Sequence, residues 1–331
     1  MKNFCLIVCT YMRPKPLLAL LKSVKKQTLY PSQIIIVDGS TNNLTKEAIE
    51  KNGFNNLEYY LVEEKDRGLT KQRNIGIEKT GKNIAVVCFL DDDTILEKEY
   101  FERIINTYIK YPDAIAVGGY ITNEVEWKKK TKPVLFDEFE KDGHIRKIGK
   151  RNLIRKRLGL LSDQEPGIMP FFSNGFPVSF LPPTDRIYKV EYFMGGVSSY
   201  KKNLFHQISF SNYFEGYGLY EDLDFCLRTS KIGKLYVNTA AKLAHHHEVA
   251  GRPNKYAYGS MVVRNGWYVW RIKYSKPSLK ARFKWNAIVL LQIFLRGVNV
   301  FTTNKRKEAL TETFGRISGW FSLLYNKPTI L

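Results

Sequence analysis

The sequence predicts an α/β protein built on a doubly wound, mostly parallel sheet flanked by helices, with a C-terminal helical extension. Short apolar runs alternate with helical patterns through the first third of the chain, as is typical of βαβ units. The run at 86–90 is continuously apolar, as expected for a strand buried on both faces. It ends in Asp91, Asp92 and Asp93, and open α/β sheets bind ligands at strand carboxyl ends.

The individual elements follow from local signals. Pro14 opens the first helix, because proline suits a first helical turn. Thr94 and Glu97 form a capping box that predicts a helix directly after the three aspartates. Strands are expected at 4–10, 33–38, 57–62, 86–91, 114–120 and 235–244, and helices at 14–27, 44–51, 70–79, from 94 onward, at 221–232 and at 284–301.

Composition narrows the classes of partner. The chain has 331 residues with 52 Lys and Arg against 32 Asp and Glu, a net charge of +20, which suits nucleic acid, an anionic membrane surface or a phosphorylated substrate. Four cysteines without metal-ligand spacing indicate reduced thiols in a cytosolic compartment. The N-terminal apolar run is too short for a signal peptide, and no uninterrupted run of about 20 apolar residues occurs, so we expect no membrane-spanning helix.

Three adjacent carboxylates repel one another unless a cation bridges them. A capping cluster for the following helix is the alternative, but the helix dipole accounts for one acid and not for three. We therefore favour a divalent-metal site at Asp91–Asp93.

Phosphate recognition of the dinucleotide-binding type is excluded by the turn after the first strand, Thr10-Tyr11-Met12-Arg13-Pro14, which has no glycine. Asp38 ends the second strand, where a carboxylate suits a nucleobase or ribose, although an Asp-Gly-Ser turn is common without a ligand. The segment 67–74 combines a glycine turn, a helix start and three cations. It suits an anionic ligand or is a solvated helix face.

The joint order of these motifs resembles glycosyltransferase family 2, whose members adopt the GT-A fold. The resemblance covers residues 3–270 and adds Gly195-Gly196-Val197-Ser198-Ser199-Tyr200-Lys201 and Tyr220-Glu221-Asp222-Leu223-Asp224 to the segments above. It implies a metal-dependent, inverting transfer of a sugar from a nucleotide-diphosphate sugar to a hydroxyl acceptor, such as a cell-envelope glycan or lipid-linked saccharide.

The resemblance also implies roles for single residues. Asp222 is the expected catalytic base, with Glu221 as the second choice. Asp93 is the expected ligand of Mn or Mg, joined by His245, although the three histidines at 245–247 are otherwise a surface cluster. The segment 214–220 places two glycines among aromatics and suits a mobile lid that stacks on a sugar. Donor binding is assigned to Thr10, Arg13, Asp38, Gly68, Arg73, Asn74, Asp91 and Asp92, the acceptor side to Gly195, Gly196 and Tyr217, and, less directly, the diphosphate side to Arg252 and 263–265.

The expected organisation is a catalytic domain at 1–270 and an amphipathic helical region at 271–331. The first contains a nucleotide-sugar-binding half at 1–123, an insertion at 124–188 and a catalytic half at 189–270. The insertion lacks helical or strand periodicity, and either shapes the acceptor pocket or is a solvated loop.

The helix at 284–301 carries a narrow polar stripe of Gln292, Arg296 and Asn299, and is apolar around the remainder. Its wide apolar face must be buried against the catalytic domain, against a second subunit or in an anionic membrane surface. The third possibility makes the protein a cytoplasmic, peripheral membrane enzyme at the inner leaflet.

Two other functions remain as alternatives. A nucleic-acid-binding protein explains the charge, but zinc-finger spacing, RNP-like strands and basic repeats are lacking, so nucleic acid is not the expected partner. A sugar-nucleotide nucleotidyltransferase needs a glycine-rich, lysine-bearing loop near the N-terminus, and the chain has none.

Overall fold

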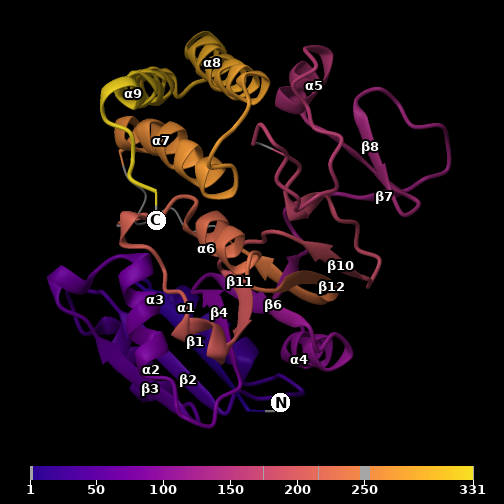
Figure 1. Cartoon of the computed structure of the whole chain (residues 1–331). Helices are drawn as coiled ribbons and strands as arrows, with labels where there is room; N and C mark the ends of the chain where they lie inside the picture. The colour runs from indigo at the N-terminus through magenta and orange to yellow at the C-terminus, as the bar shows by residue number, and fades with distance from the viewer. Residues whose placement is uncertain (1–2, 174, 215, 247–253, 331) are drawn as a thin grey trace. The chain divides into compact units, whose positions relative to one another are not determined.

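The structure, a computed structural model, describes residues 3–173, 175–214, 216–246 and 254–330 (Figure 1). The chain divides into two compact units. The first consists of Met1–Lys147, Pro166–Ile168 and Pro177–Ala250, and the second of Ile148–Glu165, Met169–Phe176 and Gly251–Leu331. The last segment of the second unit begins at Gly251, and its helix at 255–273 packs with the C-terminal helices.

A large mixed sheet organises the first unit. Its strands lie in the order β10-β12-β6-β11-β4-β1-β2-β3, with β5 paired to β12. The mostly parallel sheet that the sequence predicts is present, because only β5, β10 and β11 run against the others. The strands are β1 (Phe4–Thr10), β2 (Gln33–Asp38), β3 (Leu57–Leu61), β4 (Val86–Asp91), β5 (Thr94–Leu96), β6 (Ala114–Ile121), β10 (Ile187–Val190), β11 (Val197–Lys201) and β12 (Lys234–His245).

Helices cover the sheet and shape its core. The apolar residues of β1 and β4 are buried between them, with Phe4 packed on Phe101 of α4. In this unit the helices are α1 (Pro14–Val24), α2 (Leu44–Asn52), α3 (Leu69–Glu78), α4 (Tyr100–Lys110) and α6 (Glu221–Thr229), with short 3-10 turns η1 (Glu64–Asp66), η2 (Val178–Phe180), η3 (Lys202–His206) and η4 (Asn212–Phe214).

The predicted helix start at Thr94 is wrong. Thr94–Leu96 forms β5, which pairs antiparallel with the end of β12 and sets Thr94 opposite His245. The hydroxyl of Thr94 donates to the Asp91 carbonyl at 2.8 Å, and helix α4 begins only at Tyr100. Pairing with a distant strand outweighs the local capping signal here.

The insertion at 124–188 contains regular structure that its sequence does not indicate. Strands β7 (Lys128–Lys129), β8 (Glu138–Lys141) and β9 (His144–Lys147) form a small antiparallel sheet. The guanidinium of Arg146 lies 3.8 Å from the centre of the Phe180 ring. Strands of two to four residues are too short to show a periodicity.

The second unit contains α5 (Lys150–Arg157), α7 (Lys255–Lys273), α8 (Leu279–Thr302) and α9 (Arg306–Tyr325) (Figure 1). A Cβ atom on Gly259 or Gly315 would overlap the facing backbone, and one on Gly319 would be in tight contact with it, so these glycines allow α7 and α9 to approach closely. One described helix, α8, is long and apolar enough to cross a membrane, with a mean hydropathy of 1.3, although its apolar residues are interrupted by polar ones. Length and composition alone are weak evidence for a span.

Candidate active site

The three consecutive aspartates separate into two groups. Asp92 is buried and accepts hydrogen bonds from the Thr10 hydroxyl at 2.6 Å and from Arg13 at 3.1 Å. Burial raises the pKa of Asp92 to about 6, although Thr10 and Arg13 oppose the change. Thr10, Arg13 and Asp92 thus form one contact network between the ends of β1 and β4. Both carboxylate oxygens of Asp92 accept hydrogen bonds within this network.

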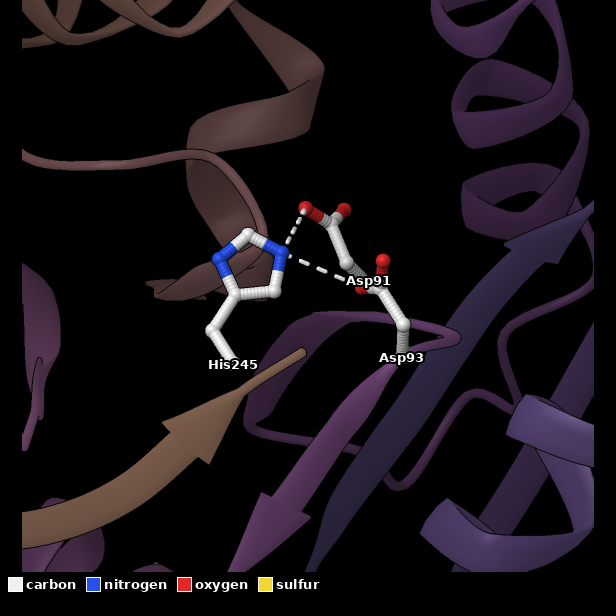
Figure 2. A group of neighbouring side chains, drawn as sticks. All are labelled: Asp91, Asp93 and His245. Carbon is white, nitrogen blue, oxygen red and sulfur yellow. Dashed lines mark ion pairs between the residues drawn. The ribbon is translucent and has the colours of Figure 1, made fainter. Parts of the chain in front are cut away.

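Asp91 and Asp93 lie together with His245 (Figure 2). The His245 Nε2 atom is 3.1 Å from an Asp93 oxygen and 4.0 Å from an Asp91 oxygen. Ligand atoms of the three residues all lie within 4.8 Å of one another. Two carboxylates and one imidazole are suitable ligands for a divalent cation such as Mn or Mg, so these three residues fit a metal site.

Glu124 contacts the ring nitrogen of His245 that does not face Asp93, and no sequence motif pointed to it. Its carboxylate lies 3.2 Å from His245 Nδ1, while the side chain of the adjacent Asn123 bonds the His245 backbone in both directions. A carboxylate behind a ligand histidine fixes the ring and raises its basicity. The available signal was topological, because Glu124 follows β6, a direct neighbour of β12.

The contacts of His245 also set its charge. Burial lowers the pKa of His245, but its hydrogen bonds to Asp93 and Glu124 outweigh burial and raise the pKa to about 10. Without a cation, a proton on Nε2 therefore bridges to Asp93. A metal ion would replace that proton.

A buried ion pair joins the expected donor side to the expected catalytic side. Arg73 on α3 donates to Glu221 at 2.5 Å and lies 3.8 Å from Asp91. Its guanidinium also lies over the rings of Phe89 and Phe210. Burial raises the pKa of Glu221 to about 8 against the opposing effect of Arg73. Arg73 and Glu221 thus neutralise each other as a buried ion pair.

Asp222 presents its carboxylate differently. It is half-buried and accepts hydrogen bonds from the backbone N–H groups of Leu223 at 2.8 Å and Gly195 at 3.3 Å. Burial raises the pKa of Asp222, and these two N–H groups oppose the change. Among the described residues, no side-chain cation donates a hydrogen bond to Asp222, so its carboxylate is better suited than that of Glu221 to accept a proton.

The predicted acceptor-side glycines have a steric reason to be glycine. A Cβ on Gly196 would overlap the Asp91 carboxylate, and one on Gly195 would crowd Arg73 and Glu221. The loop before α6 carries Tyr217, whose side chain is exposed. The two glycines therefore let the backbone pass directly beside the charged residues.

The remaining donor-side residues lie farther along the sheet edge. Asp38 is fully buried and accepts from Ser40 at two atoms and from the Tyr59 hydroxyl at 2.8 Å. Gly68 has φ +125°, a backbone region that favours glycine, and lies against the Gly216 backbone. Residues 40–43 and 61–63 with Arg67 line a cavity of about 310 Å³ beside Asp38.

Two further segments expected near the donor make structural contacts. The Asn74 amide bonds the Phe210 backbone through both its oxygen and its nitrogen, so it anchors that loop. Arg264, within the segment expected near a diphosphate, donates to Ser322 and to the Asn326 carbonyl of the second unit. Arg252 lies outside the described residues.

The mixed sheet, with its Asp-Asp-His cluster at the strand ends and an acidic pair at the start of α6, defines the class as a GT-A-type α/β fold. The family model "Glycosyl transferase family 2" matches residues 5–176, more than half of the chain, and the chain belongs to this family.

Curated relatives match shorter parts. A glucosyl-dolichyl phosphate glucuronosyltransferase of Haloferax volcanii is 32% identical over 136 residues, which cover 40% of this chain and 41% of the relative. The amylovoran biosynthesis glycosyltransferase AmsE of Erwinia amylovora is 32% identical over 122 residues, covering 36% and 45%. The matched part is thus less than half of either relative.

A solved structure supports the fold. The crystal structure of GalNAc-T7 with UDP, GalNAc and Mn²⁺ has a TM-score of 0.51 and 15% identity. The similarity covers 84% of this chain and 52% of that one. At this identity the likeness concerns the fold alone.

Proposed function

We propose that this protein is a divalent-metal-dependent, inverting glycosyltransferase that moves a sugar from a nucleotide-diphosphate sugar to a hydroxyl acceptor. Family membership supports glycosyl transfer in general. The observation that carries the specific proposal is the convergence of Asp91, Asp93 and His245 at the sheet edge, with the Arg73–Glu221 pair linking Asp91 to the helix that presents Asp222.

The metal would be held by Asp93 and His245, with Asp91 completing the protein ligands. When bound, a divalent cation supplies positive charge that stabilises a departing diphosphate. Glu124 orients His245, and Arg73 limits the negative charge beside Asp91. GalNAc-T7 was solved with UDP and Mn²⁺, which is consistent with this assignment.

Asp222 is the proposed base. Inversion needs a group that takes the proton of the acceptor hydroxyl as that oxygen attacks the anomeric carbon from the face opposite the diphosphate. Asp222 has the more accessible carboxylate of the acidic pair, and its raised pKa increases its basicity. Gly195, Gly196 and Tyr217 are the proposed acceptor-side residues.

The cavity beside Asp38 is the proposed nucleoside site. Its lining combines hydroxyl, amide and cationic side chains, including Ser40, Asn42 and Arg67. Those groups suit a ribose and a base. Thr10, Arg13 and Asp92 would hold the strand ends between this cavity and the metal cluster.

A cell-envelope glycan or a lipid-linked saccharide is the proposed acceptor. The relatives include an enzyme named for dolichyl phosphate and one named for amylovoran biosynthesis. A cytoplasmic location at the inner face of a membrane is part of the proposal, supported by four free cysteines, three of them buried.

The test is a screen of nucleotide-sugars for slow hydrolysis by the purified chain, with Mn²⁺, with Mg²⁺ and with a chelator. We expect hydrolysis of one donor class that stops in chelator and falls on the order of a hundredfold in Asp93→Ala. Asp113→Ala, at an exposed aspartate paired with Lys234, is the matched control. Full activity in chelator would refute the metal dependence, and no turnover of any donor would refute the donor class.

A further inference from the structure

The positive charge of the chain is concentrated in the second unit. Its sequence ranges contain 20 Lys and Arg against 4 Asp and Glu, a net +16 of the +20 carried by the whole chain. This unit is only about a third of the residues. The charge excess therefore lies mainly outside the unit that carries the candidate active site, and needs a partner of its own.

In helix α8 of this unit the polar stripe faces the protein and the opposite face is exposed, which is the reverse of the usual amphipathic arrangement. Arg296, from the polar stripe seen in the sequence, pairs with the buried Glu312 of α9 at 2.8 Å. Trp285, Ile288 and Val289 lie buried in the unit's apolar clusters. The polar stripe thus faces a neighbouring helix, and the opposite face of α8 is left to the outside.

That outer face is apolar. The exposed residues Phe283, Phe294 and Phe301 are 74%, 65% and 83% accessible. On a helical wheel they fall with the other exposed apolar residues of α8 in an outer stripe about 100° wide. Helix α9 has a similar outer stripe. The α8 stripe is Leu279, Phe283, Leu290, Phe294, Val298 and Phe301, and the α9 stripe is Leu310, Phe314, Phe321, Leu324 and Tyr325.

Exposed lysine and arginine side chains lie near both ends of the α8 stripe. Lys276, Lys280 and Arg282 are exposed around its start. Lys305, Arg306 and Lys307 are exposed between α8 and α9. Basic residues beside a wide apolar face match a bilayer surface whose headgroups are anionic and whose acyl chains lie just beneath.

We propose that the outer stripes of α8 and α9 dock the protein onto an anionic lipid bilayer, lying in its interface. Spanning is disfavoured, because it would separate Arg296 from Glu312 and draw Trp285 and Ile288 out of their packed clusters. Charge complementarity distinguishes this occupant from a second copy, since two such surfaces carry like charge.

The experiment is cosedimentation of the full chain with vesicles of phosphatidylcholine, with or without about 30% phosphatidylglycerol. No donor, acceptor or metal is added, so the result is independent of the proposed reaction. The test variant is Phe294→Ser with Phe301→Ser, which removes apolar surface without changing charge. Ile109→Ser, at an exposed apolar residue of α4, is the control.

We expect binding to the anionic vesicles only, weakened by salt and at least about tenfold weaker in the double variant, with the control unchanged. Circular dichroism should show both variants folded, because the substituted side chains are exposed. Equal binding of double variant and wild type would overturn the proposal. So would a dimer that the double variant abolishes without any vesicle binding, or tighter binding to random oligonucleotides than to vesicles.

Discussion

Asp222→Asn tests the assignment of the catalytic base. The carboxylate oxygens of Asp222 accept from the N–H groups of Leu223 at 2.8 Å and Gly195 at 3.3 Å. An asparagine keeps the shorter of these bonds through its oxygen, and turns its NH₂ group toward the longer one. The folded protein should lose only about 1 kcal/mol of stability, the value of one hydrogen bond.

Turnover should fall far more. Removing a general base lowers rates by about 10²- to 10⁴-fold, a rise of about 3–5 kcal/mol in the barrier. Donor binding should persist, because Asp222 lies on the acceptor side in this proposal. Single-turnover kinetics with a screened donor, equilibrium binding of its nucleoside diphosphate and urea unfolding measure the three quantities separately.

Glu221→Gln is the matched comparison. The Glu221 Oε1 atom accepts from Arg73, whereas its Oε2 is buried without a hydrogen-bond partner among the described residues. The glutamine keeps the first contact and buries an unpaired NH₂, which should cost about 1–3 kcal/mol of stability. Its catalytic loss should be small beside that of Asp222→Asn. Normal turnover in Asp222→Asn together with a large loss in Glu221→Gln would reverse the assignment.

Four further predictions address the support around the site. Glu124→Gln should weaken metal binding about 10- to 100-fold in dye competition, and an unchanged affinity would remove Glu124 from the metal's support. Metal affinity should rise with pH by up to about tenfold per unit from pH 7 to 9, because the raised pKa of His245 keeps a competing proton on Nε2 up to about pH 10; a flat profile contradicts this. Arg73→Met should destabilise the fold by about 3–5 kcal/mol in urea, since Glu221 would lose its buried partner, while Lys65→Met at an exposed pair should change nothing measurable. Gly196→Ala should cost about 1–3 kcal/mol and displace Asp91, whereas Gly81→Ala has room for its methyl group, and equal behaviour of the two would mean that Asp91 moves freely.

The fold class and the family resemblance follow from local sequence patterns. Apolar runs and helical patterns are local, so strands such as 4–10 and 33–38 are present where they were expected. The order of the motifs from Thr10 to Asp222 is likewise read from the sequence alone. The capping signal at Thr94 predicted a helix start that the structure does not have, because Thr94 pairs as a strand residue with His245.

Which residues of the site contact one another depends on tertiary packing. Sequence alone does not separate Asp92, bonded to Thr10, from Asp93, which meets His245 more than a hundred residues away. The direction of each side chain depends on backbone angles at the strand end and on the partner strand that closes over it. For the same reason only packing showed that α8 turns Arg296 toward Glu312 and its phenylalanines outward. A helical period fixes which residues share a face, but the neighbouring helix determines which face is buried.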